Sequence, residues 1–335
     1  MASATTLPDT GFAWQYTDTS HGIESHLVFD ASVPIPKAKR QTPSTLVRVL
    51  AASLNPSDYK VPELAFAGRL VMGPPPITPG KDFVGRIVDT TAPGFQAGDL
   101  VVGTTWNGAL AEYVRVPTGP LSHNALVKVP PKLAAAVEAD PRLLAELPAL
   151  AGAALGGVGT FTVQLAKIMG ASRVVSSSSA RNLELLRSLG ADEVVDYTAG
   201  DLAQSIEALT EGEGKDKFDL VLDVAGKDLE LYFQADKFLK EGGRYVLVGA
   251  PTWGDTCVLL KIALLPAFLG GGKRKFEFLR FKAESEALSN LLGWAEEGKL
   301  KVVVDEIFPK EEAVAAFKKL RAGHARGKIL ISIAN

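Results

Sequence analysis

The chain has 335 residues, of which 47% are hydrophobic and 22% charged, and its formal net charge is −2 at pH 7. This length and apolar content suffice for two domains with separate cores, and the balanced charge excludes a basic surface for nucleic acid. The single cysteine, Cys257, excludes a disulfide within the chain and a zinc site built from several cysteines, and it favours a reducing compartment.

Residues 1–20 have neither the apolar core of a secretory signal nor the arginines of a transit peptide. The longest apolar stretch, residues 257–269, contains Lys261 and Pro266 and is too short to span a bilayer. We therefore expect a cytoplasmic protein without a membrane span. A mitochondrial location is the alternative, although no transit peptide is visible.

The first third of the chain is rich in short β-type runs separated by proline and glycine. Residues 44–52 and 110–116 alternate between apolar and polar side chains, as half-exposed strands do, and residues 84–88 and 100–103 are further short apolar runs. This pattern predicts a partly open antiparallel β-domain.

A glycine-rich turn follows at residues 154–159 and leads into an apolar-striped helix over residues 158–169. Ala154 takes the first place of a G-x-G-x-x-G spacing that Gly156 and Gly159 complete. Such a turn aims backbone N–H groups and the positive helix end at a diphosphate. We therefore expect Ala154, Gly156, Gly157, Val158 and Gly159 to bind a dinucleotide; the alternative is an ordinary helix-starting turn.

Strands and helices then alternate at a regular pitch. Strands are expected at residues 173–175, 193–197, 218–224 and 244–249, with helices at residues 180–189 and 202–209 between the first three. This order is typical of βαβ units, so we expect a Rossmann-type, doubly wound parallel sheet covered on both faces.

The end of the second expected strand of this fold bears on the choice of cofactor. An enzyme that uses NAD usually places a carboxylate there, whereas this chain has Ser177, Ser178 and Arg181. Hydroxyls and a guanidinium suit a 2′-phosphate, which a carboxylate would repel. The pattern favours NADP(H) over NAD(H); a solvated serine loop in which Ser179 caps the next helix is the alternative.

The last part of the chain predicts strands at residues 302–307 and 328–333 around a helix at residues 310–320, and we expect this part to rejoin the first domain. Several segments spread along the chain resemble the zinc-free branch of the medium-chain dehydrogenase/reductase superfamily, the quinone oxidoreductase-like enzymes. Gly323-His324-Ala325-Arg326-Gly327-Lys328 is especially similar to the reticulon-interacting quinone reductases. The other matching segments are residues 54–60, 79–85, 98–101, 108–113, the glycine turn and residues 189–197.

The resemblance implies a GroES-like catalytic domain over residues 1–125, rejoined by about 270–335, and a Rossmann NADP(H)-binding domain over residues 126–269. In the zinc enzymes of this superfamily a cysteine lies near the position of Asn55, and Gly-His-Glu stands where this chain has Gly80-Lys81-Asp82. A protonated lysine cannot bind zinc. We therefore expect no metal.

The same resemblance assigns candidate roles to single residues. Asn55 would orient the carboxamide or the substrate, and Tyr59 is the candidate donor to the developing oxyanion; a packed aromatic with its hydroxyl in water is the alternative for Tyr59. Asp58 is expected to cap local backbone rather than to act as an acid. Tyr197, Gly249 and Lys328 would contact the phosphates or the adenosine, and the alternative for Lys328 is a lysine in solvent.

One departure from the family pattern lies before the glycine turn. Relatives have a helix, a loop and the first strand of the nucleotide-binding sheet there, but only residues 149–155 remain in this chain, too few for an average helix and strand. The first Rossmann strand is therefore expected to be shortened or missing. Either residues 144–155 form a strand instead, or the chain is a shortened isoform or a mis-spliced product.

These observations predict an NADPH-dependent, zinc-independent oxidoreductase. Without a metal, the reaction must leave an anion that conjugation spreads, so we expect a quinone or an α,β-unsaturated carbonyl as the acceptor. The alternative is a catalytically silent or truncated relative that acts as a nucleotide-responsive binding protein. Family members often pair through an edge strand, here expected near residues 244–249, so we also expect a homodimer.

Overall fold

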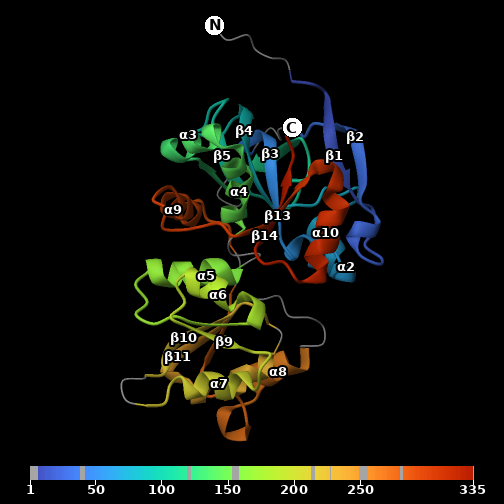
Figure 1. The fold of residues 1–335 in the computed structure, drawn as a ribbon. Coiled ribbons are helices and arrows are strands. Elements are labelled where there is room, and N and C mark those ends of the chain that lie inside the picture. Colours follow the sequence, from blue (N-terminus) through green and yellow to red (C-terminus); the bar gives the residue numbers. More distant parts are fainter. Residues whose placement is uncertain are drawn as a thin grey trace. The chain divides into compact units, whose positions relative to one another are not determined.

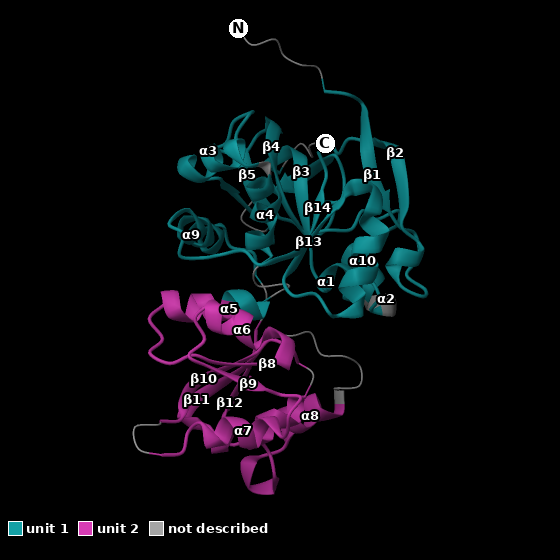
Figure 2. Ribbon diagram, in the orientation of Figure 1, with its two compact units in different colours: residues 1–161, 282–335 teal, residues 162–281 magenta. Residues whose placement is uncertain are grey.

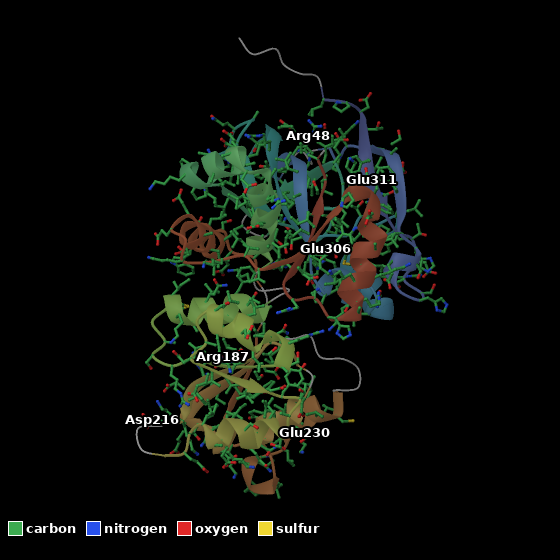
Figure 3. The ribbon with its side chains drawn as sticks, viewed as in Figure 1. Arg48, Arg187, Asp216, Glu230, Glu306 and Glu311 are labelled. Atoms are coloured by element: carbon green, nitrogen blue, oxygen red, sulfur yellow. The ribbon has the colours of Figure 1, made fainter. Side chains whose placement is uncertain are left out.

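The structure is a computed structural model that describes residues 7–37, 42–118, 122–152, 158–212, 216–226, 228–248, 256–279 and 282–334, without the side chains of residues 65–67, 141 and 256. The chain forms two compact units (Figure 2). Unit 1 comprises Met1–Phe161 and Lys282–Asn335, and unit 2 comprises Thr162–Phe281. Charged side chains such as those of Arg48 and Glu311 lie exposed (Figure 3).

Unit 1 is built on one large sheet (Figure 1). The strands across the sheet are β13 (Val304–Pro309), β14 (Lys328–Ser332), β3 (Ser44–Leu54), β4 (Asp82–Thr90), β5 (Leu100–Thr104) and β7 (Ala125–Lys128). β13 and β14 pair in parallel, and the other neighbours pair antiparallel, as the alternating patterns predict. β6 (Tyr113–Pro117) pairs with β3, and β1 (Thr10–Gln15) and β2 (Val28–Pro34) form a separate antiparallel pair.

The strands of unit 1 supply a dense apolar core. Val47, Phe83 and Val101 are completely buried in neighbouring strands, and Phe317 of α10 (Ala313–Ala322) packs in the same cluster. Other helical segments of the unit are η1 (Ile23–Ser25), α1 (Ser57–Lys60), α2 (Ala65–Met72), α9 (Ser285–Glu296) and η6 (Lys310–Glu312).

Two helices within residues 126–269, the stretch expected to form the nucleotide domain, belong to unit 1 instead. α3 (Pro131–Ala139) leads into α4 (Pro141–Ala151), which packs on β3, β4 and β14. Leu147 and Leu150 of α4 are buried there, so residues 144–151 form a helix and not a replacement strand. Because α4 buries its apolar face on this sheet, the structural boundary falls after Phe161 rather than near residue 125, and the chain returns at Lys282 rather than near residue 270.

Unit 2 has the alternating strands and helices that the sequence predicts, and its strands pair in parallel. α5 (Val158–Ile168) spans the end of unit 1 and the start of unit 2, and its Val163 packs with Val174 and Leu186. The remaining elements are β8 (Val175–Ser178), η2 (Ala180–Asn182), α6 (Leu183–Ser188), β9 (Glu193–Asp196), α7 (Leu202–Ala208), β10 (Phe218–Asp223), η3 (Leu229–Lys237), β11 (Leu239–Leu247), α8 (Thr256–Leu264), η5 (Ala267–Leu269) and β12 (Lys275–Phe278).

The parallel strands of unit 2 form two sheets, β8–β9 and β10–β11–β12. In the usual strand order 3-2-1-4-5-6 the first strand lies between the second and the fourth, which here are β8 and β10. Among residues 142–152 and 158–174, where that strand would be, the structure has none. This agrees with the expected shortening or loss of the first Rossmann strand.

The start of β10 nevertheless lies near the residues that precede β8. The guanidinium carbon of Arg173 lies 5.1 Å from the ring centroid of Phe218, and Arg173 also donates to the carboxylate of Glu193. Leu220 and Leu222 of β10 remain 42% and 39% exposed. The side chain of Arg173 therefore links the starts of the two sheets without covering β10.

One sequence expectation about the sheet edge is wrong. The strand at residues 244–249 was expected to be an edge, but β11 pairs with β10 on one side and with β12 on the other. β12 was not predicted, and it is the outer strand of this sheet.

Candidate active site

Asn55 stands at the end of β3, where the chain turns into α1. Its side chain is completely buried, and its backbone N–H donates to Asp58 Oδ2 over 2.7 Å. The N–H of Asp58 in turn donates to the carbonyl oxygen of Asn55 over 2.9 Å. The expectation that Asp58 caps local backbone is confirmed.

The side chain of Asn55 joins the ends of three neighbouring strands. Its Nδ2 donates to Asp82 Oδ2 over 2.6 Å, and its Oδ1 accepts from Lys328 Nζ over 2.6 Å. Asp82 is the first residue of β4 and Lys328 the first of β14, and both strands pair with β3. We call Asn55, Asp82 and Lys328, with the adjacent Asp58 and Lys81, the buried polar cluster.

The cluster is held in a dry environment. Burial raises the pKa of the Asp58 carboxyl from its ordinary 3.8 to about 7, and the positive charge of Lys81 offsets only part of this rise. Burial also raises the pKa of Asp82 against the opposing effect of the Lys328 charge. The pKa of the Lys328 ammonium is lowered by burial from 10.5 to about 8. Burial therefore disfavours the charged form of all three groups.

The end of α4 closes the cluster. A Cβ added to Gly152, the residue after α4, would lie 2.6 Å from Lys328 Nζ and 2.8 Å from Asn55 Oδ1, and it would overlap Asp82 Oδ2. Only glycine lets the backbone pass this close. The chain thus passes directly over the cluster where α4 ends.

The cluster does not have the donor set of a zinc site. Lys81 Nζ lies 4.5 Å from the ring centroid of Trp106, and the ammonium groups of Lys81 and Lys328 offer no lone pair while protonated. Asn55, Lys81 and Asp82 thus provide neither a thiolate nor an imidazole where the resembling zinc enzymes have them.

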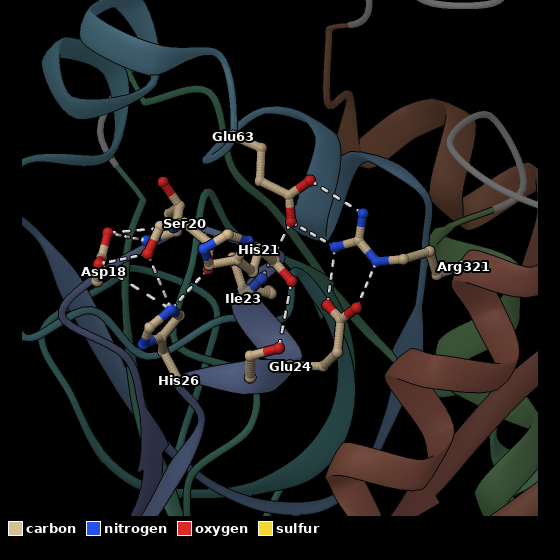
Figure 4. A network of polar contacts seen from close by, with 10 residues as sticks. Asp18, Ser20, His21, Ile23, Glu24, His26, Glu63 and Arg321 are labelled. Carbon is tan, nitrogen blue, oxygen red and sulfur yellow. Dashed lines mark hydrogen bonds and ion pairs between the residues drawn. The ribbon is translucent and has the colours of Figure 1, made fainter.

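Tyr59 lies one turn beyond Asn55 and is half-buried against the core of unit 1. The guanidinium carbon of Arg321 lies 4.3 Å from its ring centroid, and the same guanidinium pairs with Glu24 and Glu63 (Figure 4). Burial raises the pKa of the Tyr59 hydroxyl. The packing agrees with the packed-aromatic interpretation, and the role of oxyanion donor stays a prediction.

The expected cofactor residues of unit 2 gather at the carboxyl ends of β8 and β9. Ser177 and Ser178 end β8, and Arg181 follows in η2. Tyr197 comes directly after β9, and its N–H donates to the carbonyl oxygen of Ser178 over 3.2 Å. The carboxyl ends of strands are where open α/β sheets bind nucleotides. Two serines therefore end β8 and an arginine follows in η2, at the place where enzymes that use NAD usually have an acid.

The other expected cofactor residues divide into two groups. Val158 and Gly159 open α5, as the glycine-turn pattern predicts, whereas Ala154, Gly156, Gly157 and Gly249 lie outside the described residues. Lys328 is only 1% exposed, so it is not the solvent lysine of the alternative interpretation. Its ammonium donates to Asn55 Oδ1, and a contact of the same ammonium with a phosphate stays a prediction.

Sequence reasoning missed part of the cluster. Asp82, Lys81 and Gly152 were not predicted as neighbours of Asn55, although Lys81 and Asp82 had been singled out as replacements for zinc ligands. No local signal pointed to their burial, because Pro79 and Gly80, directly before Lys81, are typical of an exposed turn. Burial of two adjacent charged residues needs partners, and pattern analysis does not supply them.

A β-sheet unit joined to a parallel-sheet nucleotide unit is the architecture of dehydrogenases and reductases, and the comparisons with known proteins agree. A family profile described as "Alcohol dehydrogenase GroES-like domain" matches residues 41–131, and one described as "Zinc-binding dehydrogenase" matches residues 189–331. A trans-enoyl reductase of Aspergillus terreus is 36% identical, with 98% of each chain covered.

Two further matches extend this relationship. An NADPH-dependent alkenal/one oxidoreductase of Arabidopsis thaliana is 32% identical over 97% of this chain and 80% of its own. The solved structure of the quinone oxidoreductase from Coxiella burnetii superposes with a TM-score of 0.72 at 26% identity, covering 96% of this chain and 98% of that chain. The chain belongs to the quinone oxidoreductase-like branch of the medium-chain dehydrogenases/reductases, a family of oxidoreductases.

The match to the Aspergillus terreus reductase also bears on the missing strand. It extends over 362 aligned positions, more than the 335 residues of this chain. That relative therefore contains residues without a counterpart here, as the short connection between α4 and α5 leads one to expect. No helix in the described part of the chain has the length and apolar character needed to cross a membrane.

Proposed function

We propose that this oxidoreductase transfers a hydride from NADPH to a quinone or to the β-carbon of an α,β-unsaturated carbonyl, without a metal. The observation that carries the choice of NADPH is the carboxyl end of β8, with Ser177, Ser178 and Arg181 and no acid among them. The name of the Arabidopsis thaliana relative, an NADPH-dependent alkenal/one oxidoreductase, supports the same class of acceptor.

The buried polar cluster supports the metal-free part of the proposal. Reduced nicotinamide would supply the hydride, and an enolate or a phenolate would remain on the acceptor. Asp82 accepts from the amide nitrogen of Asn55 and Lys328 donates to its amide oxygen, so the orientation of this side chain is fixed before an anion develops on the acceptor. Donors fixed in advance stabilise charge without a reorganisation cost. Tyr59 is the residue that we propose as donor to the oxyanion, and Asn55 as the residue that orients the reactants.

A turnover assay tests the proposal. The purified chain is mixed with NADPH and, in separate series, with quinones and with enones, and the loss of nicotinamide absorbance is followed. We expect oxidation of NADPH with members of at least one series, and slower turnover after Tyr59→Phe. An unchanged rate for Tyr59→Phe would remove Tyr59 from the mechanism, and no turnover with either series would contradict the proposed reaction.

The choice of cofactor has its own test, the charge reversal Arg181→Glu. A carboxylate at this position should repel a 2′-phosphate, so we expect the Kd for NADPH to rise about tenfold or more while the Kd for NADH changes little. Arg187→Glu makes the same change in charge on α6, at an exposed position (Figure 3), and should leave both constants unchanged. An unchanged preference in Arg181→Glu would refute the role given to this arginine.

Two further features belong to the proposal. We propose a homodimer that forms through the outer strand β12, because this edge is unpaired within the described chain. We also propose the cytoplasm as its compartment, with mitochondria as the alternative, because the single cysteine, Cys257, favours a reducing compartment. Sedimentation velocity and cell fractionation test these two statements. The silent-relative alternative receives no support from the names of the relatives.

A further inference from the structure

A group of exposed apolar side chains lies on one projecting part of unit 2. Leu260 and Leu264 on α8 are 53% and 76% exposed, and Phe268 and Leu269 on η5 are 85% and 62% exposed. We call these four side chains the apolar tip. The segment that follows α8 projects from unit 2 at the foot of Figure 1.

The backbone of the tip is a compact, hydrogen-bonded turn. The N–H groups of Leu269 and Gly271 both donate to the carbonyl oxygen of Pro266, over 2.9 and 3.0 Å. A Cβ on Gly271 would overlap the carbonyl oxygen of Leu265, so this position requires glycine. The turn therefore holds Phe268 and Leu269 outward by its own geometry.

The helix that leads to the tip is apolar on two faces. Ile262 packs against the core of unit 2, while Leu260 and Leu264 face outward. A helix that is apolar all round is normally buried on all sides. The inward face borders an apolar hollow of about 620 Å³, whose lining residues are Tyr232, Leu259, Ile262, Ala263, Phe276 and Phe278.

Positive charge lies beside the apolar tip. Lys273, Arg274 and Lys275 follow it in sequence, and Lys261 lies within α8. Their carboxylate partners are Asp236, 2.7 Å from Lys273 Nζ, Glu277, 2.6 Å from Lys275 Nζ, and Glu230, 3.3 Å from Lys261 Nζ (labelled in Figure 3). The four cations outnumber these three anions, so the margin of the tip carries net positive charge.

We propose that the apolar tip docks on the surface of a phospholipid bilayer that contains anionic lipids. Leu264, Phe268 and Leu269 enter the boundary between headgroups and acyl chains, and the basic margin lies at the level of the phosphates. This is the arrangement of interfacial segments, which combine an apolar face with lysine and arginine beside it. The tip is too short to span the bilayer and lies on one leaflet.

Charge complementarity favours a bilayer over a second copy of the chain. In a two-fold dimer built on the tip itself, rather than on the edge of β12, the tip would face its own copy, so two positive margins would meet and repel each other. Phosphate headgroups attract the same margin. Apolar quinones and enones dissolve in bilayers, so docking would bring the enzyme to its acceptor, and this benefit rests on the proposed function. The docking itself is measured without any substrate.

The test is sedimentation of the full chain with lipid vesicles. Vesicles of phosphatidylcholine and phosphatidylglycerol should pellet the natural chain, and vesicles of phosphatidylcholine alone should pellet less of it. The variant Leu264→Ser/Phe268→Ser/Leu269→Ser should lower the partition coefficient about tenfold or more, because the apolar area that enters the bilayer is lost. The control Val28→Ser/Leu70→Ser removes apolar side chains that are 64% and 77% exposed in unit 1, and it should bind as the natural chain does.

Two results would overturn the proposal: a natural chain that stays in the supernatant with both vesicle types, or a control variant that loses as much binding as the tip variant. A second probe does not depend on the folding of the triple variant. Phe268→Trp should gain fluorescence quenching by brominated lipid relative to the natural chain, and equal quenching of the two would contradict insertion of the tip.

The competing occupant and the proposed function are separated by two parallel measurements. If the tip variant dissociates an oligomer in sedimentation velocity and vesicles bind neither protein, the tip is an interface between copies and the bilayer proposal is wrong. NADPH fluorescence is recorded on the same samples. A response to NADPH without vesicle binding overturns the docking alone, and vesicle binding without a response to NADPH overturns the proposed function alone.

Discussion

The sheet of unit 1 is continuous and buried, whereas the parallel sheet of unit 2 is divided. All residues of β5 and all but the last of β14 are buried, but β8, β9 and β10 contain no buried residue. The division falls where the first strand of a Rossmann sheet belongs. Parallel sheets are usually buried on both faces, whereas among the described residues β8 and β10 each have one edge without a partner.

The two units differ in how firmly the surrounding strands hold their candidate site residues. In unit 1 the polar cluster at the strand ends joins β3, β4 and β14 and is closed by Gly152. In unit 2 the candidate cofactor residues stand on β8, whose other edge has no partner within the described chain. Unit 1 is therefore expected to be the more rigid of the two, and the following predictions test that contrast.

The largest expected effect is in hydrogen exchange. Amides of β3 and β4 should exchange at least about a thousandfold more slowly than amides of β8 and β10, because unpaired sheet edges open locally. Peptide-resolved exchange followed by mass spectrometry measures both sets in one experiment. Equal protection of β8 and β3 would mean that the edge of β8 is covered, and the contrast between the units would be lost.

The second effect concerns the buried charge of unit 1. Lys328→Ala removes the buried ammonium that donates to Asn55 and whose charge offsets the burial of the Asp82 carboxyl, which should lower the free energy of unfolding by about 3–5 kcal/mol. Lys60→Ala removes an exposed lysine from α1 and serves as the control, with no measurable change expected. Denaturant unfolding of both variants gives the values. A loss below 1 kcal/mol, roughly the size of an exposed ion pair, would show that the cluster is solvated.

A third, smaller effect is expected where α4 ends. Gly152→Ala places a methyl group against Asp82 and Lys328, and such overpacking usually costs about 1–3 kcal/mol. The matched change Gly293→Ala, in α9, meets no atom within 4 Å and should instead stabilise the helix by up to about 1 kcal/mol. Opposite signs in thermal unfolding would support the close passage of the chain over the cluster, and a neutral Gly152→Ala would contradict it.

The effect that is smallest over a single pH unit is the dependence of stability on pH. Because the pKa of Asp58 is raised by burial from 3.8 to about 7, the folded chain binds an extra proton between these values. Stability should therefore be greatest below pH 4 for this group and fall as the pH rises through 7, by no more than about 1.4 kcal/mol per pH unit. Asp58→Asn keeps an acceptor for the N–H of Asn55 and should flatten this slope, whereas an unchanged slope would remove Asp58 as its cause.

Elements with strong local patterns could be predicted from the sequence. The strands of unit 1 and the alternation in unit 2 were recognisable from apolar spacing, although their ends differ by a few residues, as β8 (Val175–Ser178) shows against the expected residues 173–175. The shortage of chain before α5 was also visible, because it depends on length alone. The assignment of α4 to unit 1 was not, since its amphipathic pattern does not say which sheet it covers.

The candidate site was predicted only in part. Asn55 and the serines of β8 stand out by motif, but the contact between Lys328 and Asn55 joins residues 273 positions apart. Such a contact depends on the register of β14 against β3, which no local pattern encodes. For Tyr59 the motif was visible and the covering guanidinium of Arg321 was not, because Arg321 comes from a distant helix.

Titration calorimetry of the folded chain with NADPH tests most directly whether unit 2 binds a dinucleotide despite its divided sheet. The account predicts one site per chain, with heat on addition of NADPH and weaker binding of NADH. A folded chain that gives no heat with either dinucleotide would contradict it.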